Sequence, residues 1–285
     1  MRNWPTPLSL VIPDTSLSTH GNLMDFTIRS GFIARYAAMA NVHRIIIYRE
    51  EGGRDDPYGK RLEMLLKFMV IPPYLRKRLF PLNEDLKYAG LMPPINIPSH
   101  PQSPRINLGD IRVGLMEGPK AWVDINKQAL VEGNSFVAAP PGIAGLTFLR
   151  VTQLSPLKAE IAKPDFYAGF FVQSTRRSLG ATLRELVGLK VATSRYGEDY
   201  SKVSHQLLDL SKKFEETFVV LGSPSSDLSE IAKKEGISIK GLCDFNLNLD
   251  PGQVLKSIRT DEAIPLALIT LNCISSMRGE ILMCG

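Results

Sequence analysis

Continuous apolar runs alternate with helix-spaced apolar positions near the start of the chain. Residues 8–13, LSLVIP, form a run that is typical of a strand buried on both faces. Apolar residues then recur at helical spacing over residues 28–39, and residues 44–50 predict a second buried strand. Residues 57–70 predict a helix that ends before Pro72. This order of strand, helix and strand favours parallel pairing.

The pattern changes over residues 89–165. Prolines are too dense between residues 92 and 104 for a helix, and short alternating segments follow. The alternation predicts about five short strands, among them residues 111–118, 121–127, 135–140 and 145–151. Short strands of this number favour a small OB-like barrel, a class of domain that often binds oligonucleotides.

From residue 166 the strand and helix alternation returns. The predicted strands are residues 167–174, 189–194, 217–223 and 245–247, and the predicted helices are residues 179–188, 203–213 and 228–234. The simplest architecture is a discontinuous α/β domain made of residues 1–88 and 166–285, with residues 89–165 inserted as a β module.

Composition narrows the class of protein. The 285 residues, 44% of them hydrophobic, can fill a sizeable core. Three cysteines, odd in number and late in the chain, do not suit a disulfide framework, and no window has the roughly 18 apolar residues of a membrane span. We therefore expect a cytoplasmic protein with no membrane segment. The net charge of +5 suits an anionic partner without requiring one.

Two groups of cations are candidates for contact with RNA. Arg76, Lys77 and Arg78 follow one another beside an aromatic residue, and Arg176 is next to Arg177. A solvated helix end explains such a group equally well.

Three polar segments follow predicted strands of the second half. They are ATSRYG after Val191, LGSPSSD after Val220 and NLDPGQ after Leu247. Ligands of open parallel sheets gather at the carboxyl ends of strands, so these segments can converge on one pocket. Gly222 and Gly252 would allow the backbone to approach a flat ring such as adenine. Taken one segment at a time, an ordinary strand-to-helix connection is the better interpretation.

The segments TSRYG, VVLGS, NLDPGQ and SIRTDEAIPLALITLN together resemble the C-terminal half of SPOUT-class RNA methyltransferases. The segment PPYLRKRLFPLNEDLKYAGLMPP resembles one branch of that class, the archaeal and eukaryotic RNA uridine-N3 methyltransferases with an inserted OB-like barrel. The resemblance covers nearly the whole chain. It implies a trefoil-knotted parallel sheet with helices on both faces, a homodimer, S-adenosyl-L-methionine as cofactor and RNA, ribosomal RNA above all, as substrate.

The resemblance also implies the site. Residues at matching positions that would line the cofactor are Thr193, Arg195, Gly222, Asn248, Leu249, Gly252, Ile258 and Thr260. Ser223 and Val254 stand where the family usually has glycine. A β-branched side chain at position 254 is expected to hinder close contact with the cofactor.

Methylation of uridine N3 requires the imide proton to leave. Arg259 and Glu262 are the candidate catalytic residues, the first to stabilise charge on the base and the second to accept the proton. A surface ion pair and a helix-start charge are equally good roles for them. Thr260 is a candidate N-cap, and Pro265 should distort the first turn of the helix or delay its start.

Other functions fit less well. The sequence has no GxxxxGK[ST], GxGxxG or GxSxG motif, and its four histidines lack the spacing of metal ligands. Two alternatives stay open. One is an RNA-binding ribosome-assembly factor that keeps the fold without methyl transfer, and the other is a structural dimer whose pocket holds another small molecule.

Overall fold

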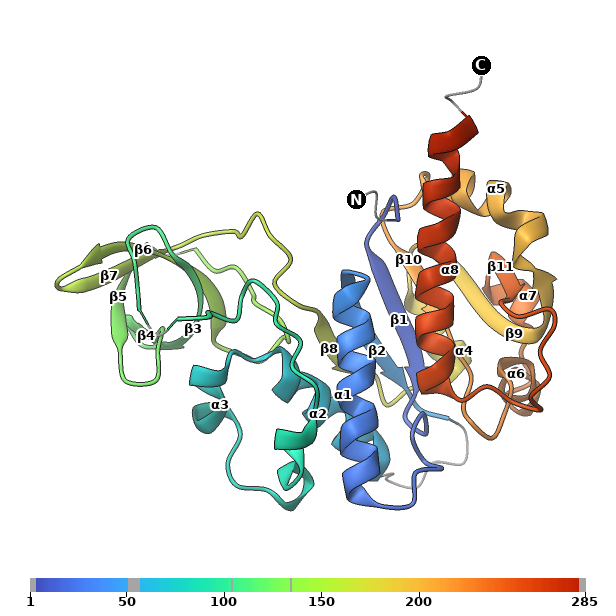
Figure 1. Ribbon diagram of the computed structural model, residues 1–285, viewed down its shortest axis with the longest axis horizontal. Coiled ribbons are helices and arrows are strands. Elements are labelled where there is room, and N and C mark those ends of the chain that lie inside the picture. The colour runs from blue at the N-terminus through green and yellow to red at the C-terminus, as the bar shows by residue number, and fades with distance from the viewer. Residues whose placement is uncertain (1–3, 51–56, 104, 134, 282–285) are drawn as a thin grey trace.

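A six-stranded parallel sheet forms the centre of the larger part of the molecule (Figure 1). The computed structural model describes residues 4–50, 57–103, 105–133 and 135–281. All five strand pairings in this sheet are parallel. Its strands, in spatial order, are β11 (Phe245–Asn248), β9 (Leu189–Asp199), β10 (Thr217–Val220), β1 (Leu8–Pro13), β2 (Val42–Tyr48) and β8 (Phe171–Ser174).

Helices cover both faces of this sheet because each face of the strands is apolar. β1 shows this most clearly, since all six of its residues are buried. One face packs against α1 (Leu23–Met39), α2 (Pro57–Val70), α5 (Tyr200–Ser211) and α8 (Thr260–Ile281). The other packs against α4 (Leu179–Glu185), α6 (Leu228–Lys234) and α7 (Ile239–Leu242). The predicted parallel sheet with helices on both faces is confirmed.

Strand β9 differs from the prediction in a way that matters for the site. It was expected to end at residue 194, but it continues to Asp199. Its pairing with β11 is interrupted, since Asn246 pairs with Ala192 and the next residue, Leu247, pairs with Glu198. Residues 193–197 therefore form an excursion out of the ladder within one strand, an unusually large irregularity of the bulge type.

The C-terminal segment crosses the loop that follows β10. After β11, at the edge of the sheet, the chain returns to α8, which lies beside α1 (Figure 1). At this crossing the hydroxyl of Thr260 donates a hydrogen bond of 2.8 Å to the carbonyl of Gly222. The predicted knot depends on this crossing, and the knot itself stays a prediction.

The inserted segment contains a closed five-stranded barrel. Its strands are β3 (Ile111–Glu117), β4 (Lys120–Trp122), β5 (Gln128–Glu132), β6 (Leu146–Leu154) and β7 (Leu157–Ile161), closed in the order β3, β4, β5, β7, β6. The strand predicted at residues 135–140 is wrong, because these residues make only an isolated bridge, between Ala138 and Thr147. Two prolines at 140 and 141 remove the N–H donors that a strand there would need.

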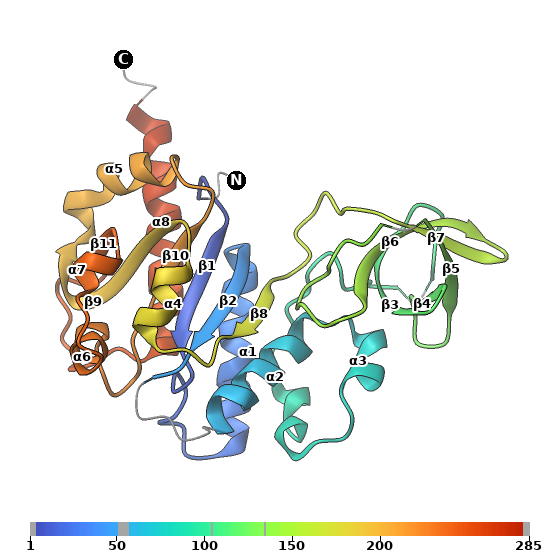
Figure 2. The same cartoon turned by 180° about the vertical axis from the view of Figure 1, so that it is seen from behind.

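The barrel packs against helix α3 (Pro73–Leu79), on the side of the molecule away from α8 (Figure 2). Tyr74 is buried in the shared apolar cluster, and its hydroxyl donates to the Val113 carbonyl of β3 at 2.6 Å. The guanidinium of Arg78 lies 3.3 Å from the ring centroid of Trp122 and donates to the Ile125 carbonyl at 3.0 Å. Two short 3₁₀ turns, Glu84–Leu86 and Ala89–Leu91, follow α3.

No helix in the described part of the chain has the length and apolar character needed to cross a membrane. The same residues contain no group of three or more His, Cys, Asp and Glu side chains placed to hold a metal ion.

The buried side chain of His100, which precedes the barrel, should make the stability of the protein depend on pH. It is buried, its Nε2 bonds to the Val70 carbonyl at 2.8 Å, and burial lowers the pKa of its imidazole from 6.5 to about 4. The folded protein thus keeps His100 neutral where the unfolded chain takes up a proton. We expect the free energy of unfolding to fall by roughly 3 kcal/mol between pH 6.5 and 4 through this group.

Urea unfolding across this pH range measures that loss. His100→Gln should flatten the dependence, while His205→Gln, on the exposed face of α5, should not. Equal slopes for the wild type and His100→Gln would contradict the assignment.

Candidate functional site

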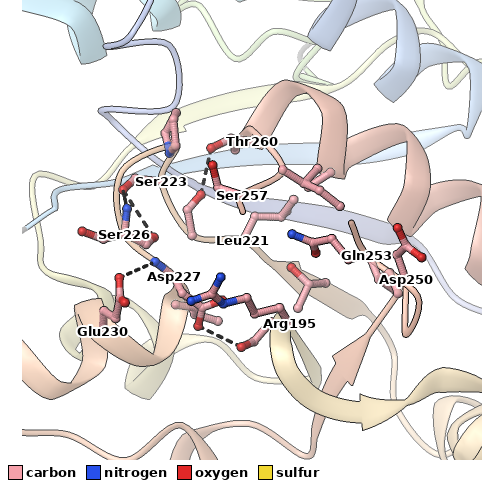
Figure 3. Close-up of a pocket in the computed structure, with 18 of the residues that line it drawn as sticks. Arg195, Leu221, Ser223, Ser226, Asp227, Glu230, Asp250, Gln253, Ser257 and Thr260 are labelled. Atoms are coloured by element: carbon pink, nitrogen blue, oxygen red, sulfur yellow. Dashed lines mark hydrogen bonds between the residues drawn. The ribbon is translucent and has the colours of Figure 1, made fainter. Parts of the chain in front are cut away.

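A cavity of about 240 Å³ opens at the carboxyl edge of the sheet, where β9, β10 and β11 lie side by side (Figure 3). It is bounded by the excursion of β9, the loop after β10, the segment after β11 and the start of α8. Residues that line it are Thr193–Arg195, Leu221–Leu228, Glu230, Asn248–Asp250, Gln253, Lys256–Ile258, Thr260, Ala263 and Leu266. The three polar segments that the sequence analysis singled out therefore share one cavity.

Side chains of the first segment fix the β9 excursion to the loop after β10. Thr193 donates its hydroxyl to the Val220 carbonyl at 3.2 Å, and Ser194 donates to a carboxylate oxygen of Asp227 at 2.8 Å. Asp227 also caps α6 and forms a reciprocal capping box with Glu230. These bonds set the width of the cavity between the two segments.

The loop after β10 is tightly folded on itself. A Cβ added at Gly222 would lie 2.8 Å from the Leu228 nitrogen and 2.9 Å from the Ser226 carbonyl oxygen. Ser223, in place of the glycine expected from the resemblance, uses its side chain to close the turn: its Oγ accepts from the Ser226 N–H at 3.0 Å. Its hydroxyl also donates to buried Glu50 at 3.1 Å. Ser223 thus stabilises the loop.

The segment after β11 is joined to the β9 excursion. Asn248 donates its side-chain amide to the Arg195 carbonyl at 3.0 Å, and Arg195 donates from Nη1 to the Lys256 carbonyl at 2.7 Å. Val254 is 96% exposed and is not among the lining residues, so its side chain does not fill the cavity, and its effect on the cofactor stays a prediction. Gly252 also lies outside the lining, and the nearest atom to a Cβ there would be the Asp250 Oδ1, at 3.9 Å.

Helix α8 begins at the cavity with a first turn that differs from the prediction. Thr260 is inside the helix, so its predicted N-cap role is wrong, and its hydroxyl bonds to Gly222 instead. The Arg259 carbonyl accepts from the N–H groups of both Glu262 (3.0 Å) and Ala263 (2.8 Å), which tightens the turn. Pro265 lies within the helix without delaying its start.

The two predicted catalytic residues lie at the edge of the site. Arg259 and Glu262 are exposed and do not line the cavity. The Glu262 carboxylate accepts from the Arg259 N–H at 2.9 Å, which is half of a capping box. In this conformation Glu262 performs the helix-start role that the sequence analysis left open.

The predicted cationic patches divide into structural and exposed members. Arg76 is half-buried, lies over Phe68, and donates to the carbonyls of Ile71 and Met69, and burial lowers the pKa of its guanidinium to about 10. Lys77, its neighbour, is exposed. Arg78 holds the barrel through Trp122, as described above. Only Lys77 of this group therefore presents its charge without such a packing role.

Arg176 and Arg177 are both exposed, at the end of β8. Arg177 forms an ion pair with Glu185. Arg176 has a φ of 52°, a left-handed conformation that is uncommon for residues other than glycine.

Sequence reasoning missed Gly197 and Glu50. A Cβ at Gly197 would lie 2.5 Å from the Leu247 carbonyl carbon, so only glycine fits where the excursion rejoins β11. Glu50 braces the loop after β10 from a segment 173 residues away, and nothing in its local sequence indicates that role. The capping pattern Asp227 to Glu230 was readable from spacing alone.

Comparison with known proteins assigns the family. The sequence profile of the family described as "Putative RNA methyltransferase" matches residues 7–271. An uncharacterized protein of Halobacterium salinarum is 27% identical over 92% of this chain and 98% of its own length. The 28S rRNA (uridine-N(3))-methyltransferase of Homo sapiens is 27% identical over 95% of this chain and 79% of its own length.

Among solved structures, the SpoU methyltransferase AviRb of Streptomyces viridochromogenes, in complex with AdoMet, aligns with a TM-score of 0.40 at 10% identity, over 98% of this chain and 60% of that one. The profile match covers more than nine-tenths of the chain. This protein therefore belongs to that family of RNA methyltransferases.

Proposed function

We propose that this protein transfers a methyl group from S-adenosyl-L-methionine to N3 of a uridine in ribosomal RNA. The observation that carries the proposal is the single cavity that three neighbouring segments of the sheet enclose. Its position at the carboxyl edge is where open parallel sheets bind their ligands. The acceptor is inferred from relatives in human, mouse and fly, which carry the name 28S rRNA (uridine-N(3))-methyltransferase.

The charges of the cavity suit this cofactor. Three carboxylates line it, those of Asp227, Glu230 and Asp250, against two cations, Arg195 and Lys256. S-adenosyl-L-methionine carries a sulfonium, an ammonium and one carboxylate, so its net charge is opposite to that of the lining. Electrostatic complementarity of this kind favours binding and fixes orientation.

Apolar and polar groups are both available for the two ends of the cofactor. Leu221, Leu249, Ile258 and Leu266 supply apolar surface for adenine, while the hydroxyls and amides of the loops suit the ribose and the methionine. All of the residues predicted to contact the cofactor except Gly252 line the cavity. Their contact with S-adenosyl-L-methionine is part of the proposal.

The chemistry requires little from the protein beyond positioning. The sulfonium supplies the methyl group, which leaves by an in-line displacement, so the chain has to align the acceptor and exclude water. A proton must leave N3, and the base must be unpaired for N3 to be reached. We propose Arg259 and Glu262 for charge stabilisation and proton removal. For this role the Glu262 carboxylate must exchange its bond to Arg259 for one to the base.

RNA would contact both the inserted barrel and the α/β part of the chain. The closed barrel pairs β5 with β7 in parallel and its other neighbouring strands antiparallel, which supports the predicted OB-like class. Folds of this kind commonly bind single-stranded nucleic acid. Lys77 on α3, beside the barrel, and Arg176 at the sheet are the exposed cations that we assign to the RNA path.

A second copy of the chain would complete the site. Leu266 and Ile269 are 39% and 60% exposed, and Cys273 is exposed one turn further along α8, so an apolar stripe runs from the cavity along this helix. Leu266 belongs to both the stripe and the cavity lining. A homodimer that buries the stripe would therefore close the cavity on its open side.

Calorimetry followed by methyl transfer tests the function. We expect S-adenosyl-L-methionine to release measurable heat on binding, and labelled methyl groups to appear in ribosomal RNA at a uridine whose mass increase maps to the base. Absence of heat at millimolar cofactor, with RNA still bound, would instead support an assembly factor without activity. Methyl incorporation at another position would remove uridine N3 from the proposal.

A further inference from the structure

A second cavity of about 240 Å³ occupies the other half of the same sheet edge. The first lies at β9, β10 and β11, whereas this one lies where β1, β2 and β8 end. Asp14 follows β1, Tyr48 ends β2 and Arg49 follows it, and Ser174 ends β8. Lys60, near the start of α2, forms part of the remaining wall.

Cations from three separate segments line this cavity. They are Arg49 after β2, Lys60 on α2 and Arg176 after β8. The lining also holds two carboxylates, so its cations exceed its acids by one: Glu63 accepts from Lys67 at 2.6 Å, and Asp14 accepts from the Glu50 N–H at 3.0 Å. A polar cavity with this excess of positive charge suits an anion.

The backbone around the cavity is built to hold these groups in place. A Cβ at Gly59 would lie 2.7 Å from the Cβ of Asp14, so α2 lies directly against the end of β1. Arg176 keeps its left-handed conformation, and the Arg49 N–H donates to the neighbouring Arg177 carbonyl at 2.7 Å. Non-glycine residues in this conformation persist where surrounding contacts fix them, and they cluster at binding sites.

Three hydrogen bonds, along two routes, connect the wall of this cavity with that of the first. Tyr48 lines the second cavity and donates its hydroxyl to the carbonyl of Leu221, which lines the first, at 2.9 Å. Glu50 accepts from Ser223 of the first cavity and donates its N–H to Asp14 of the second. One layer of buried residues thus separates the two cavities.

We propose that the second cavity binds a phosphodiester of the RNA strand whose neighbouring base enters the first cavity. This inference rests on the proposed function, because a strand crossing the sheet edge meets both cavities in turn. A phosphate held by Arg49, Lys60 and Arg176 would fix the strand so that only one base reaches the methyl donor. Phosphate contacts position a strand without reading its sequence.

The test compares two variants of the lining with a matched control. Lys60→Ala removes one cation, and Arg176→Gly removes another while accommodating the positive φ. Lys240→Ala makes the same change in charge on α7, just before the amino end of β11, at the opposite edge of the sheet. In each variant, RNA affinity is measured against salt concentration, and the affinities for S-adenosyl-L-methionine and for inorganic phosphate are measured by calorimetry.

We expect each lining variant to weaken RNA binding about tenfold and to reduce the salt slope by about one, with cofactor affinity unchanged. The proposal would be overturned if Lys60→Ala and Arg176→Gly showed the same RNA affinity and the same salt slope as Lys240→Ala. A loss of inorganic phosphate binding with an unchanged RNA isotherm would also overturn it in favour of a small-anion site. Failure of the proposed function would show separately, because the wild-type protein would then release no heat on addition of S-adenosyl-L-methionine.

Discussion

Gly197→Ala is expected to destabilise the chain by roughly 3 kcal/mol and to weaken cofactor binding at least about tenfold. The added methyl group would lie within 2.8 Å of three backbone atoms of Asn246 and Leu247, and backbone in a ladder cannot move aside as a flexible side chain can. Strand β11 would have to separate from β9 where both border the cavity. Urea unfolding and calorimetry with S-adenosyl-L-methionine measure the two effects.

Gly252→Ala is the matched control for that substitution. It adds the same methyl group in the segment after β11, where the nearest atom would be 3.9 Å away. Both stability and cofactor affinity should stay at their original values. If Gly252→Ala weakened cofactor binding as much as Gly197→Ala, the cofactor would approach Gly252 directly and our account of the cavity would be wrong.

Arg29→Met is expected to lower the free energy of unfolding by about 3 kcal/mol, because it leaves a buried carboxylate without its cation. Asp261, in the first turn of α8, is 3% exposed, and Arg29 of α1 donates to its Oδ2 at 3.3 Å. In the described part of the chain, the other oxygen, Oδ1, has no hydrogen-bond partner. Methionine keeps much of the length and apolar stem of arginine, so packing along α1 is retained.

A double variant separates loss of the ion pair from general damage. Adding Asp261→Asn to Arg29→Met removes the unpaired charge, and most of the lost stability should return. Thr260 precedes Asp261 and holds Gly222 in the wall of the cavity, so cofactor affinity should fall and recover with stability. A single variant within about 0.5 kcal/mol of the wild type would show that the pair contributes little.

Long apolar segments made the sheet and several helices predictable. β1, α2 and α6 occupy the residues that their patterns indicated, since each presents a strong apolar run or stripe and ends at a clear signal. β5 and β7 were missed because short, half-exposed barrel strands such as LKAEI carry little periodicity. Barrel closure brings together partners that are distant in sequence, and periodicity contains no information about such pairing.

The candidate site was predictable in its position and less so in its details. Convergence of three segments follows from the geometry of parallel strands, which the sequence indicates. The bonds between segments, such as Ser194 to Asp227 and Thr260 to Gly222, depend on spatial neighbours that spacing does not reveal. Arg76 illustrates the same limit, because a cluster of cations in sequence does not show which member is buried.

The TSRYG excursion is joined to sheet at both of its ends, since Ala192 and Glu198 both pair with β11. A loop that closes over a ligand loses about 1 kcal/mol of conformational entropy for each backbone residue it orders. Here folding has already imposed that ordering, so the cavity meets its ligand preorganised. Affinity for the methyl donor on this side of the cavity can therefore be changed by substituting side chains. Induced fit contributes little there, because the backbone is already ordered.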